Sequence, residues 1–151
     1  MGKPTYFLLV DDDIDDTSLF EEILKEVDPG IRFRSAENGK EALDLLRKEQ
    51  DSLPHVIFLD LNMPKMDGKQ CLSELKSDPV LQKIPVIMYT TSSQSRDIEQ
   101  TMMSGAICFI TKPTDINELK HIISSIAGSV HGNLDSKLKS LSNSSRTFIV
   151  C

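Results

Sequence analysis

The sequence predicts an α/β protein of five β-strand–α-helix units, whose strands form one parallel sheet and whose helices cover its two faces. Short apolar runs alternate with segments whose apolar residues recur at helical spacing. The connections between successive runs are long enough to cross a sheet, which favours parallel strands with helices on both faces. Polar residues follow the apolar runs, and the carboxyl ends of parallel strands are where ligands bind in such sheets. We therefore expect a single doubly wound domain over residues 4–128.

Four of the five expected strands are continuous apolar runs, which is typical of strands buried on both faces. Only the second alternates between apolar and charged residues, as an edge strand does. The strands are YFLLV (6–10), IRFR (31–34), VIFLD (56–60), PVIMYT (85–90) and ICFI (107–110).

Each expected strand is followed by an amphipathic helix with a recognisable start or stop. Pro29 and Gly30 end the first helix, and Asn38 with Glu41 forms a capping-box pattern before the second. Gly105 and Gly128 end the fourth and fifth helices. The inward-facing residues of the five helices are, in order, Leu19, Phe20, Ile23, Leu24 and Val27; Ala42, Leu45 and Leu46; Cys71, Leu72 and Leu75; Ile98, Met102 and Met103; and Ile116, Leu119, Ile122, Ile123 and Ile126.

Residues 129–151 differ in composition from the rest of the chain. They are rich in Ser and Asn and show no clear apolar stripe. We expect a flexible tail with some helix at 134–141. The final TFIVC is apolar enough to pack against the domain, but the sequence does not indicate where.

Composition excludes several classes of protein. The formal net charge of −6 argues against a nucleic-acid surface, which needs clustered Lys and Arg. No apolar run approaches the roughly 20 residues of a membrane span. Cys71, Cys108 and Cys151 are widely spaced without a CxxC pattern, which argues against a disulfide framework or zinc site and favours a cytoplasmic location.

The acidic run after the first strand needs an explanation, because close like charges repel. If the strand order is 2-1-3-4-5, then Asp11 and Asp12 at the end of the first strand lie beside Asp60 at the end of the third. Two carboxylates ~4 Å apart repel by roughly 1 kcal/mol in water and about 4 kcal/mol at an effective dielectric of 20. A hard divalent cation such as Mg²⁺ relieves this repulsion, with a backbone carbonyl near Asn62 as a further ligand.

Two further strand ends supply the other parts of a phosphoryl-transfer site. Lys112 follows the fifth strand with a positive charge, and Thr90 ends the fourth with a hydroxyl. A carboxylate nucleophile flanked by a metal and a lysine is suited to phosphoryl transfer. The remaining aspartates of the run, Asp13, Asp15 and Asp16, are better explained as capping and dipole-stabilising residues of the first helix.

The chain resembles the receiver domain of two-component response regulators over residues 4 to about 128. The pieces LLVDDD, VIFLDLNMPKMDG, IPVIMYTTS and GAICFITKP occur in the order and spacing of that family. The resemblance implies the flavodoxin-like fold with strand order 2-1-3-4-5. The TTS and ITKP segments look most like the stand-alone regulators that partner phytochromes.

The resemblance also implies a role for each residue of the site. Asp60 is the residue phosphorylated by a histidine kinase or phosphotransfer protein. The metal ligands are Asp11, Asp12, Asp60 and the Asn62 carbonyl, and the metal is Mg²⁺. Thr90 and Lys112 contact the phosphoryl group. Phe109 is the switch aromatic that turns from an exposed to a buried position with Thr90, and the Lys112–Pro113 bond is cis. A downstream protein target, a monomer or weak dimer, and no nucleic-acid or membrane partner are expected.

Two alternative functions are consistent with parts of the pattern. DIDDT (13–17) fits the signature of aspartate-nucleophile phosphatases similar to haloacid dehalogenase, although Asp13 lies beyond the strand and no acidic pair follows Lys112. A flavodoxin-like binding module without phosphorylation would need a phosphate-cradling loop after the first strand, where this chain has aspartates. Both fit less well than a signalling receiver that is not an enzyme in the ordinary sense.

Overall fold

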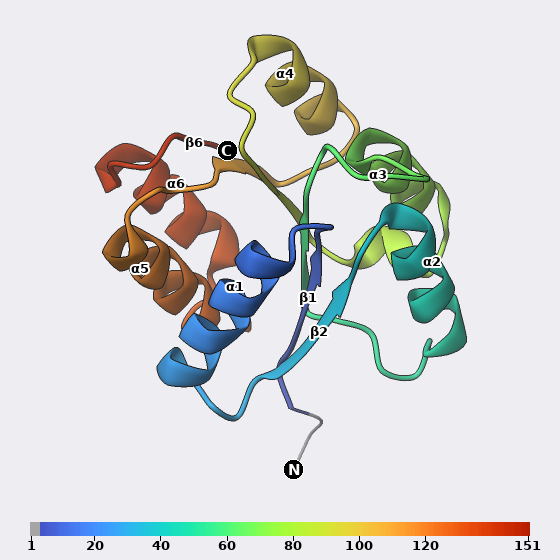
Figure 1. Cartoon of the computed structure of the whole chain (residues 1–151), viewed down its shortest axis with the longest axis horizontal. Helices are drawn as coiled ribbons and strands as arrows, with labels where there is room; N and C mark the ends of the chain where they lie inside the picture. The colour runs from blue at the N-terminus through green and yellow to red at the C-terminus, as the bar shows by residue number, and fades with distance from the viewer. Residues whose placement is uncertain (1–3) are drawn as a thin grey trace.

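The computed structural model describes residues 4–151 and contains one six-stranded sheet between two layers of helices (Figure 1). The strand order is β2-β1-β3-β4-β5-β6, and the first five strands are parallel. The order 2-1-3-4-5 is therefore confirmed. The sixth strand pairs antiparallel with β5 and was not predicted. The strands are β1 (Tyr6–Val10), β2 (Arg32–Ala36), β3 (Val56–Leu59), β4 (Val86–Thr90), β5 (Cys108–Thr111) and β6 (Ile149–Val150).

The five expected helices are present, together with a short 3-10 turn and a sixth α-helix. Their caps follow the sequence signals: the Asn38 side chain accepts a hydrogen bond from the Glu41 N–H, and Gly128 is the C-cap of the fifth helix. The helices are α1 (Ile14–Val27), α2 (Gly39–Lys48), α3 (Gly68–Ser77), α4 (Ser95–Met103), α5 (Ile116–Ala127) and α6 (Leu134–Ser144), and the 3-10 turn η1 is Leu81–Lys83.

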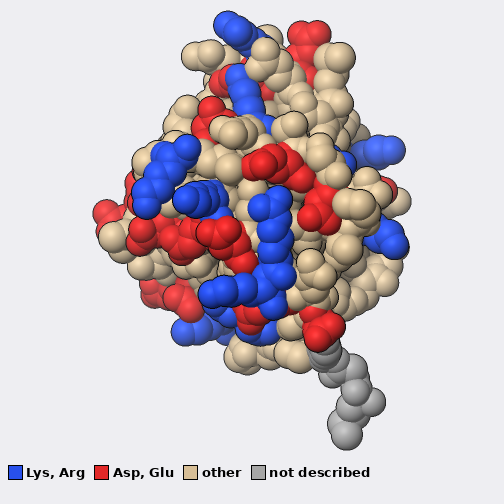
Figure 2. Space-filling model, turned by 90° about the vertical axis from the view of Figure 1, so that its right-hand side faces the viewer, with Lys and Arg blue, Asp and Glu red and all other residues tan. Residues whose placement is uncertain are grey.

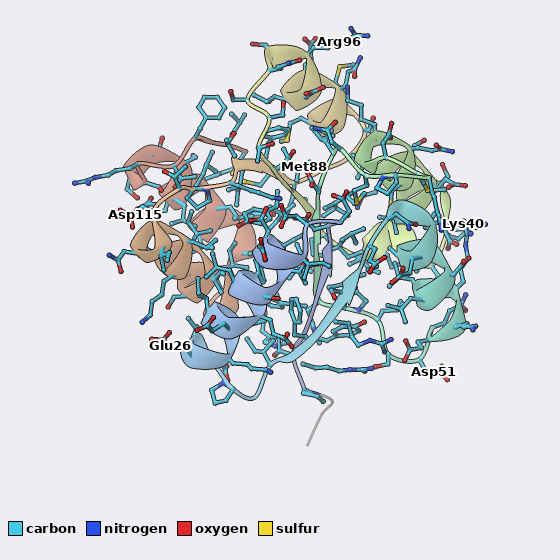
Figure 3. All side chains as sticks on the ribbon, viewed as in Figure 1. Glu26, Lys40, Asp51, Met88, Arg96 and Asp115 are labelled. Carbon is cyan, nitrogen blue, oxygen red and sulfur yellow. The ribbon has the colours of Figure 1, made fainter. Side chains whose placement is uncertain are left out.

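The sheet divides the core in two, because successive side chains of a strand point to opposite faces. In β1, Leu8 and Val10 join the cluster beneath α2, α3 and α4, whereas Phe7 and Leu9 join the one beneath α1, α5 and α6. Figure 3 shows Met88 of β4 at the centre of the molecule, with Arg96 and Lys40 at its outside. The central strands are thus buried on both faces, and their polar ends are held rigidly.

On the face that carries α2 and α3, basic and acidic side chains are interleaved, without a broad patch of one sign (Figure 2). Over residues 4–151, no helix combines the length and the apolar character that crossing a membrane requires.

The segment after α5 is folded, which corrects the expectation of a flexible tail. The helix predicted at 134–141 is present and extends over Leu134–Ser144. Leu138 and Leu141 of this helix are buried, as is Ile149 of β6. This packing was not predicted, because the three apolar side chains are spread over a Ser-rich segment and form no periodic pattern.

Candidate functional site

The carboxyl ends of β1 and β3 bring three aspartates together. Asp11 follows Val10 and donates its N–H to the Ala36 carbonyl at 2.9 Å, and the Asp60 N–H donates to the Val10 carbonyl at 2.9 Å. These hydrogen bonds fix both residues to neighbouring strands. One carboxylate oxygen each from Asp11, Asp12 and Asp60 lies within 4.8 Å of the others. The convergence predicted from the strand order is therefore present.

Lys112 lies among these carboxylates. Its Nζ is 2.7 Å from Asp11 Oδ2 and 3.7 Å from Asp60 Oδ2, and its side chain is 9% exposed. It also lies 5.5 Å from the centre of the Tyr89 ring, which shields it from water. Burial alone would lower the pKa of Lys112, but the carboxylates of Asp11 and Asp16, each 2.7 Å from Nζ, raise the pKa above its ordinary value. The ammonium is therefore held charged at neutral pH.

Asp16 is a site residue that the sequence analysis missed. Its Oδ2 lies 2.7 Å from Lys112 Nζ, as close as that of Asp11. Asp13 instead caps α1, since its Oδ1 accepts a hydrogen bond from the Asp16 N–H. The capping role expected of Asp13 is thus confirmed, whereas Asp16 has a long-range partner. The sequence signal for this role was the position of Asp16 in the first turn of α1, which begins close to Asp11 and Asp12.

Asp11 is the most buried carboxylate of the cluster, with 3% of its surface exposed. Its Oδ1 accepts a hydrogen bond from the Asp13 N–H at 2.9 Å. Its Oδ2 has the close ionic contact with Lys112 but, among the described residues, no partner in hydrogen-bonding geometry. Burial raises the pKa of Asp11 to about 6, with Lys112 and the Asp13 N–H opposing the rise.

These features fit a divalent cation. Asp11, Asp12 and Asp60 bring three carboxylates together around the single positive charge of Lys112, and the repulsion that this one charge does not offset is costly. Mg²⁺ and similar ions bind one or two carboxylates together with water and phosphate oxygens. Asp12 is exposed beside the buried pair, and Asn62 is exposed in the loop two residues after Asp60. The donor set is therefore open to solvent on one side.

Gly68 shapes the loop that leaves Asp60, a role that was not predicted from the sequence. Its N–H donates to the Leu61 carbonyl at 2.8 Å. A Cβ at this position would lie 2.1 Å from the Asp60 carbonyl oxygen, a backbone atom that cannot move aside cheaply. Glycine is needed here because two stretches of backbone touch. The sequence signal was a glycine at the first position of a helix, eight residues after the candidate nucleophile.

Thr90 and Phe109 lie where the topology predicts, but Phe109 is not in the expected state. Thr90 ends β4 fully buried, and its Oγ1 accepts a long hydrogen bond of 3.5 Å from the Ser92 N–H. Phe109 pairs with Met88 of β4 and Val150 of β6 and is 0% exposed. The expectation of an exposed Phe109 is wrong for this structure, because its side chain lies in the cluster beneath α2, α3 and α4, with Val150 of β6 packed against that cluster.

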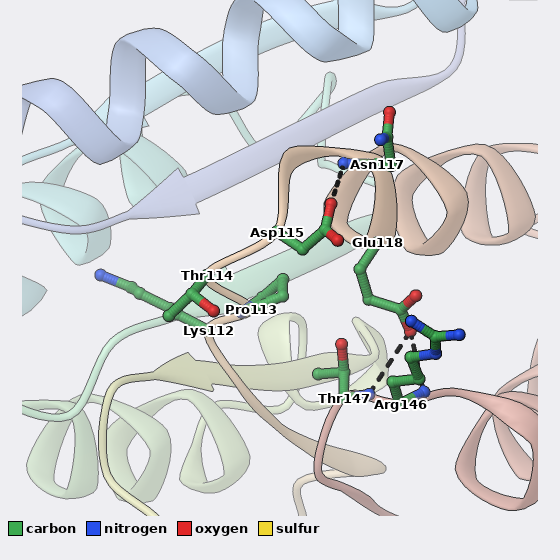
Figure 4. Close-up of a pocket in the computed structure, with 8 residues that line it drawn as sticks. All are labelled: Lys112, Pro113, Thr114, Asp115, Asn117, Glu118, Arg146 and Thr147. Atoms are coloured by element: carbon green, nitrogen blue, oxygen red, sulfur yellow. Dashed lines mark hydrogen bonds between the residues drawn. The ribbon is translucent and has the colours of Figure 1, made fainter.

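The loop after β5 corrects a second expectation. The described residues contain no cis peptide bond, so Lys112–Pro113 is trans, as most X–Pro bonds are. Figure 4 shows the Lys112 side chain extending away from the groove that Glu118, Arg146 and Thr147 line. The lysine therefore reaches the carboxylates without the predicted cis bond.

The chain matches known proteins over most of its length. Residues 7–124 match the family model described as the response regulator receiver domain. The response regulator Rcp1 of Synechocystis sp. is 32% identical over 129 residues, which are 83% of this chain and 88% of Rcp1.

Two solved structures with the same fold are similarly close. The phosphorylated cyanobacterial phytochrome response regulator RcpA has a TM-score of 0.75 at 35% identity, over 82% of this chain and 91% of its own. The Mn²⁺-bound form of Rcp1 has a TM-score of 0.74 at 32% identity, over 83% of this chain and 94% of its own.

Proposed function

The chain belongs to the response regulator receiver domain family, and from this premise we propose that Asp60 accepts a phosphoryl group in a Mg²⁺-dependent reaction that switches a protein-interaction surface. The observation that carries the proposal is the cluster of Asp11, Asp12 and Asp60, with oxygens within 4.8 Å of one another around Lys112, whose side chain is 9% exposed. Domains of this family bind a divalent metal, and the finer assignment to Mg²⁺ is part of the proposal.

Asp60 has one carboxylate oxygen held and one available. Its Oδ1 accepts a hydrogen bond from the Leu61 N–H at 2.8 Å, which fixes the carboxylate plane. Its Oδ2 faces Lys112 across 3.7 Å. We assign Oδ2 as the oxygen that attacks phosphorus, because Oδ1 is already engaged.

The surrounding residues would stabilise the charge that moves to the transferring group. Asp11, Asp12, Asp60 and the Asn62 carbonyl would hold Mg²⁺, which when bound neutralises negative charge on the phosphoryl oxygens. Lys112 would leave Asp16 and pair with a phosphoryl oxygen, and the Thr90 hydroxyl would donate to another. These new contacts can bias a two-state element. Because Phe109 is already buried, the readout would begin with Lys112 and Thr90.

The phosphoryl donor is a histidine kinase or a phosphotransfer protein, as the family implies. The downstream target is a protein that recognises the altered surface. An aspartate-nucleophile phosphatase is disfavoured, since Asp13, its candidate nucleophile, caps α1. We propose that the chain accepts and loses its own phosphoryl group without turning over free phosphate esters.

Labelling with acetyl phosphate tests the proposal. The wild-type protein should take up one acid-labile phosphoryl group with Mg²⁺ present and none with a chelator. Asp60→Asn should abolish the label. Asp44→Asn is the matched control, because Asp44 is an exposed aspartate on α2 outside the cluster. Full labelling of Asp60→Asn, or acid-stable label on a hydroxyl residue, would exclude the assignment.

A further inference from the structure

The segment after α5 is attached to the domain at several points. Leu138 and Leu141 of α6 are buried in the cluster that also contains α5 residues. Glu118 of α5 accepts a hydrogen bond from the Ser145 hydroxyl. It also accepts hydrogen bonds from the Arg146 and Thr147 N–H groups (Figure 4). These contacts lead the chain back to the edge of the sheet, where β6 begins.

The register of β6 brings two cysteines opposite each other. Phe109 pairs with Val150, and Ile110 pairs with Ile149. One residue further along the same antiparallel register, Cys108 stands opposite Cys151. Opposed residues in antiparallel strands have Cα atoms about 4.5 or 5.5 Å apart and side chains on the same face. Both separations lie within the range of about 4.4–6.8 Å that a disulfide spans.

The two thiols are in contact and differ in access to solvent. Cys108 is buried and Cys151 is exposed, and both are free. Interaction with the Cys108 thiol lowers the pKa of Cys151, and nearby Lys139 lowers it further. The same contact, together with burial, raises the pKa of Cys108. Cys151 is therefore the thiol that reacts first, since the thiolate is the nucleophile and must reach its partner.

We propose that Cys108 and Cys151 are a redox modification site, at which low-molecular-weight disulfides form an intramolecular disulfide that fixes β6 to β5. The Cys151 thiolate attacks one sulfur of the small disulfide and expels the first small thiolate. Cys108 then loses its proton, attacks the Cys151 sulfur and expels the second small thiolate. Two cysteine thiols are oxidised, one small disulfide is reduced to two thiols, and the protons from the cysteines go to the leaving groups.

The bond would make the attachment of the tail covalent. In the reduced protein, β6 is held by two residue pairs and by the contacts of Glu118 and α6, which can open locally. In the oxidised protein, β6 cannot leave the edge beside Phe109. Cys71 lies in the cluster on the opposite face of the sheet and takes no part.

Incubation of the folded protein with oxidised glutathione, after removal of reductant, tests the site. The number of free thiols, counted after unfolding, should fall from three to one. The mass should fall by about 2 Da for the two lost hydrogens. Peptide mapping should show Cys108 joined to Cys151, and Tm should rise by about 5–15 °C, the shift expected for closing a loop of this length. Reductant should reverse every change.

Two variants separate this outcome from its alternatives. Cys71→Ala should form the same bond, so that its free thiols fall from two to none. Cys151→Ser, a change at an exposed position, should keep both remaining thiols free after the same treatment. A stable glutathione adduct on Cys151 with Cys108 still a thiol would overturn the proposal, as would a bond between the Cys151 residues of two chains. None of these readouts depends on phosphorylation, so they hold equally in Asp60→Asn.

Discussion

Lowering the pH in the absence of divalent cations should stabilise the fold through Asp11. Burial raises the pKa of this carboxyl from 3.8 to about 6. A raised carboxyl pKa means that the folded state binds more protons than the unfolded chain between about pH 4 and pH 6. Stability therefore increases as the pH falls through 6. This is opposite to the behaviour of a carboxylate whose pKa folding lowers.

The size of the effect follows from these two values. At pH 7.5 Asp11 is ionised in both states, and its contribution to the pH dependence is close to zero. At pH 5.0 it is mostly protonated in the folded state and mostly ionised in the unfolded chain. Linkage then gives about 1 kcal/mol of added stability between pH 7.5 and pH 5.0. Such a difference is measurable by denaturant unfolding.

Urea unfolding at several pH values in EDTA measures this contribution, with Asp11→Asn as the comparison. The variant keeps an oxygen for the Asp13 N–H but cannot ionise, so the wild-type gain relative to the variant isolates Asp11 from all other groups. Adding Mg²⁺ should stabilise the wild type more at pH 7.5 than at pH 5.0, because the cation competes with the proton. If the wild type and Asp11→Asn have the same pH dependence in EDTA, the carboxyl is not destabilised by burial, and the electrostatic argument for a cation at this site fails.

Three further predictions concern the residues around the cluster. Asp12→Ala should weaken Mg²⁺ binding about tenfold or more in calorimetric titration, because the cation loses one of its few charged ligands; unchanged affinity would contradict the ligand assignment. Gly68→Ala should lower the free energy of unfolding in urea by about 1–3 kcal/mol, since the added Cβ meets the Asp60 carbonyl. An unchanged free energy of unfolding would mean that the loop backbone moves aside to accommodate the Cβ. Glu118→Gln should speed hydrogen exchange at the Arg146 and Thr147 amides without affecting α2; equal exchange rates would show that Glu118 does not hold the tail.

Much of the fold and of the site follows from local sequence signals. Continuous apolar runs identify buried strands, and once the strand order is set, Asp11 and Asp60 must meet because the polar residues after neighbouring strands share one edge. The caps of α2 and α5 were predicted for the same reason, since Asn38 and Gly128 act within a few residues of their position.

The features that sequence reasoning missed depend on contacts between distant residues. Asp16 reaches Lys112 from 96 residues away, and its role cannot be distinguished locally from helix capping. Gly68 is needed because of a carbonyl eight residues earlier, not because of its own turn. Phe109 lies in a cluster against which Val150 packs, and Val150 belongs to a strand of only two residues. No periodic pattern can indicate so short an element.

This short last strand also bears on how the molecule avoids association with its own copies. Without it, β5 would be the outer strand of the sheet, with unpaired backbone groups and the apolar Phe109 and Ile110 available to a strand of another molecule. With it, the outermost strand on this side of the sheet is two residues long and runs opposite to its neighbour. Such an edge offers few backbone groups to template a further strand, so β6 protects this side of the sheet from pairing with another copy.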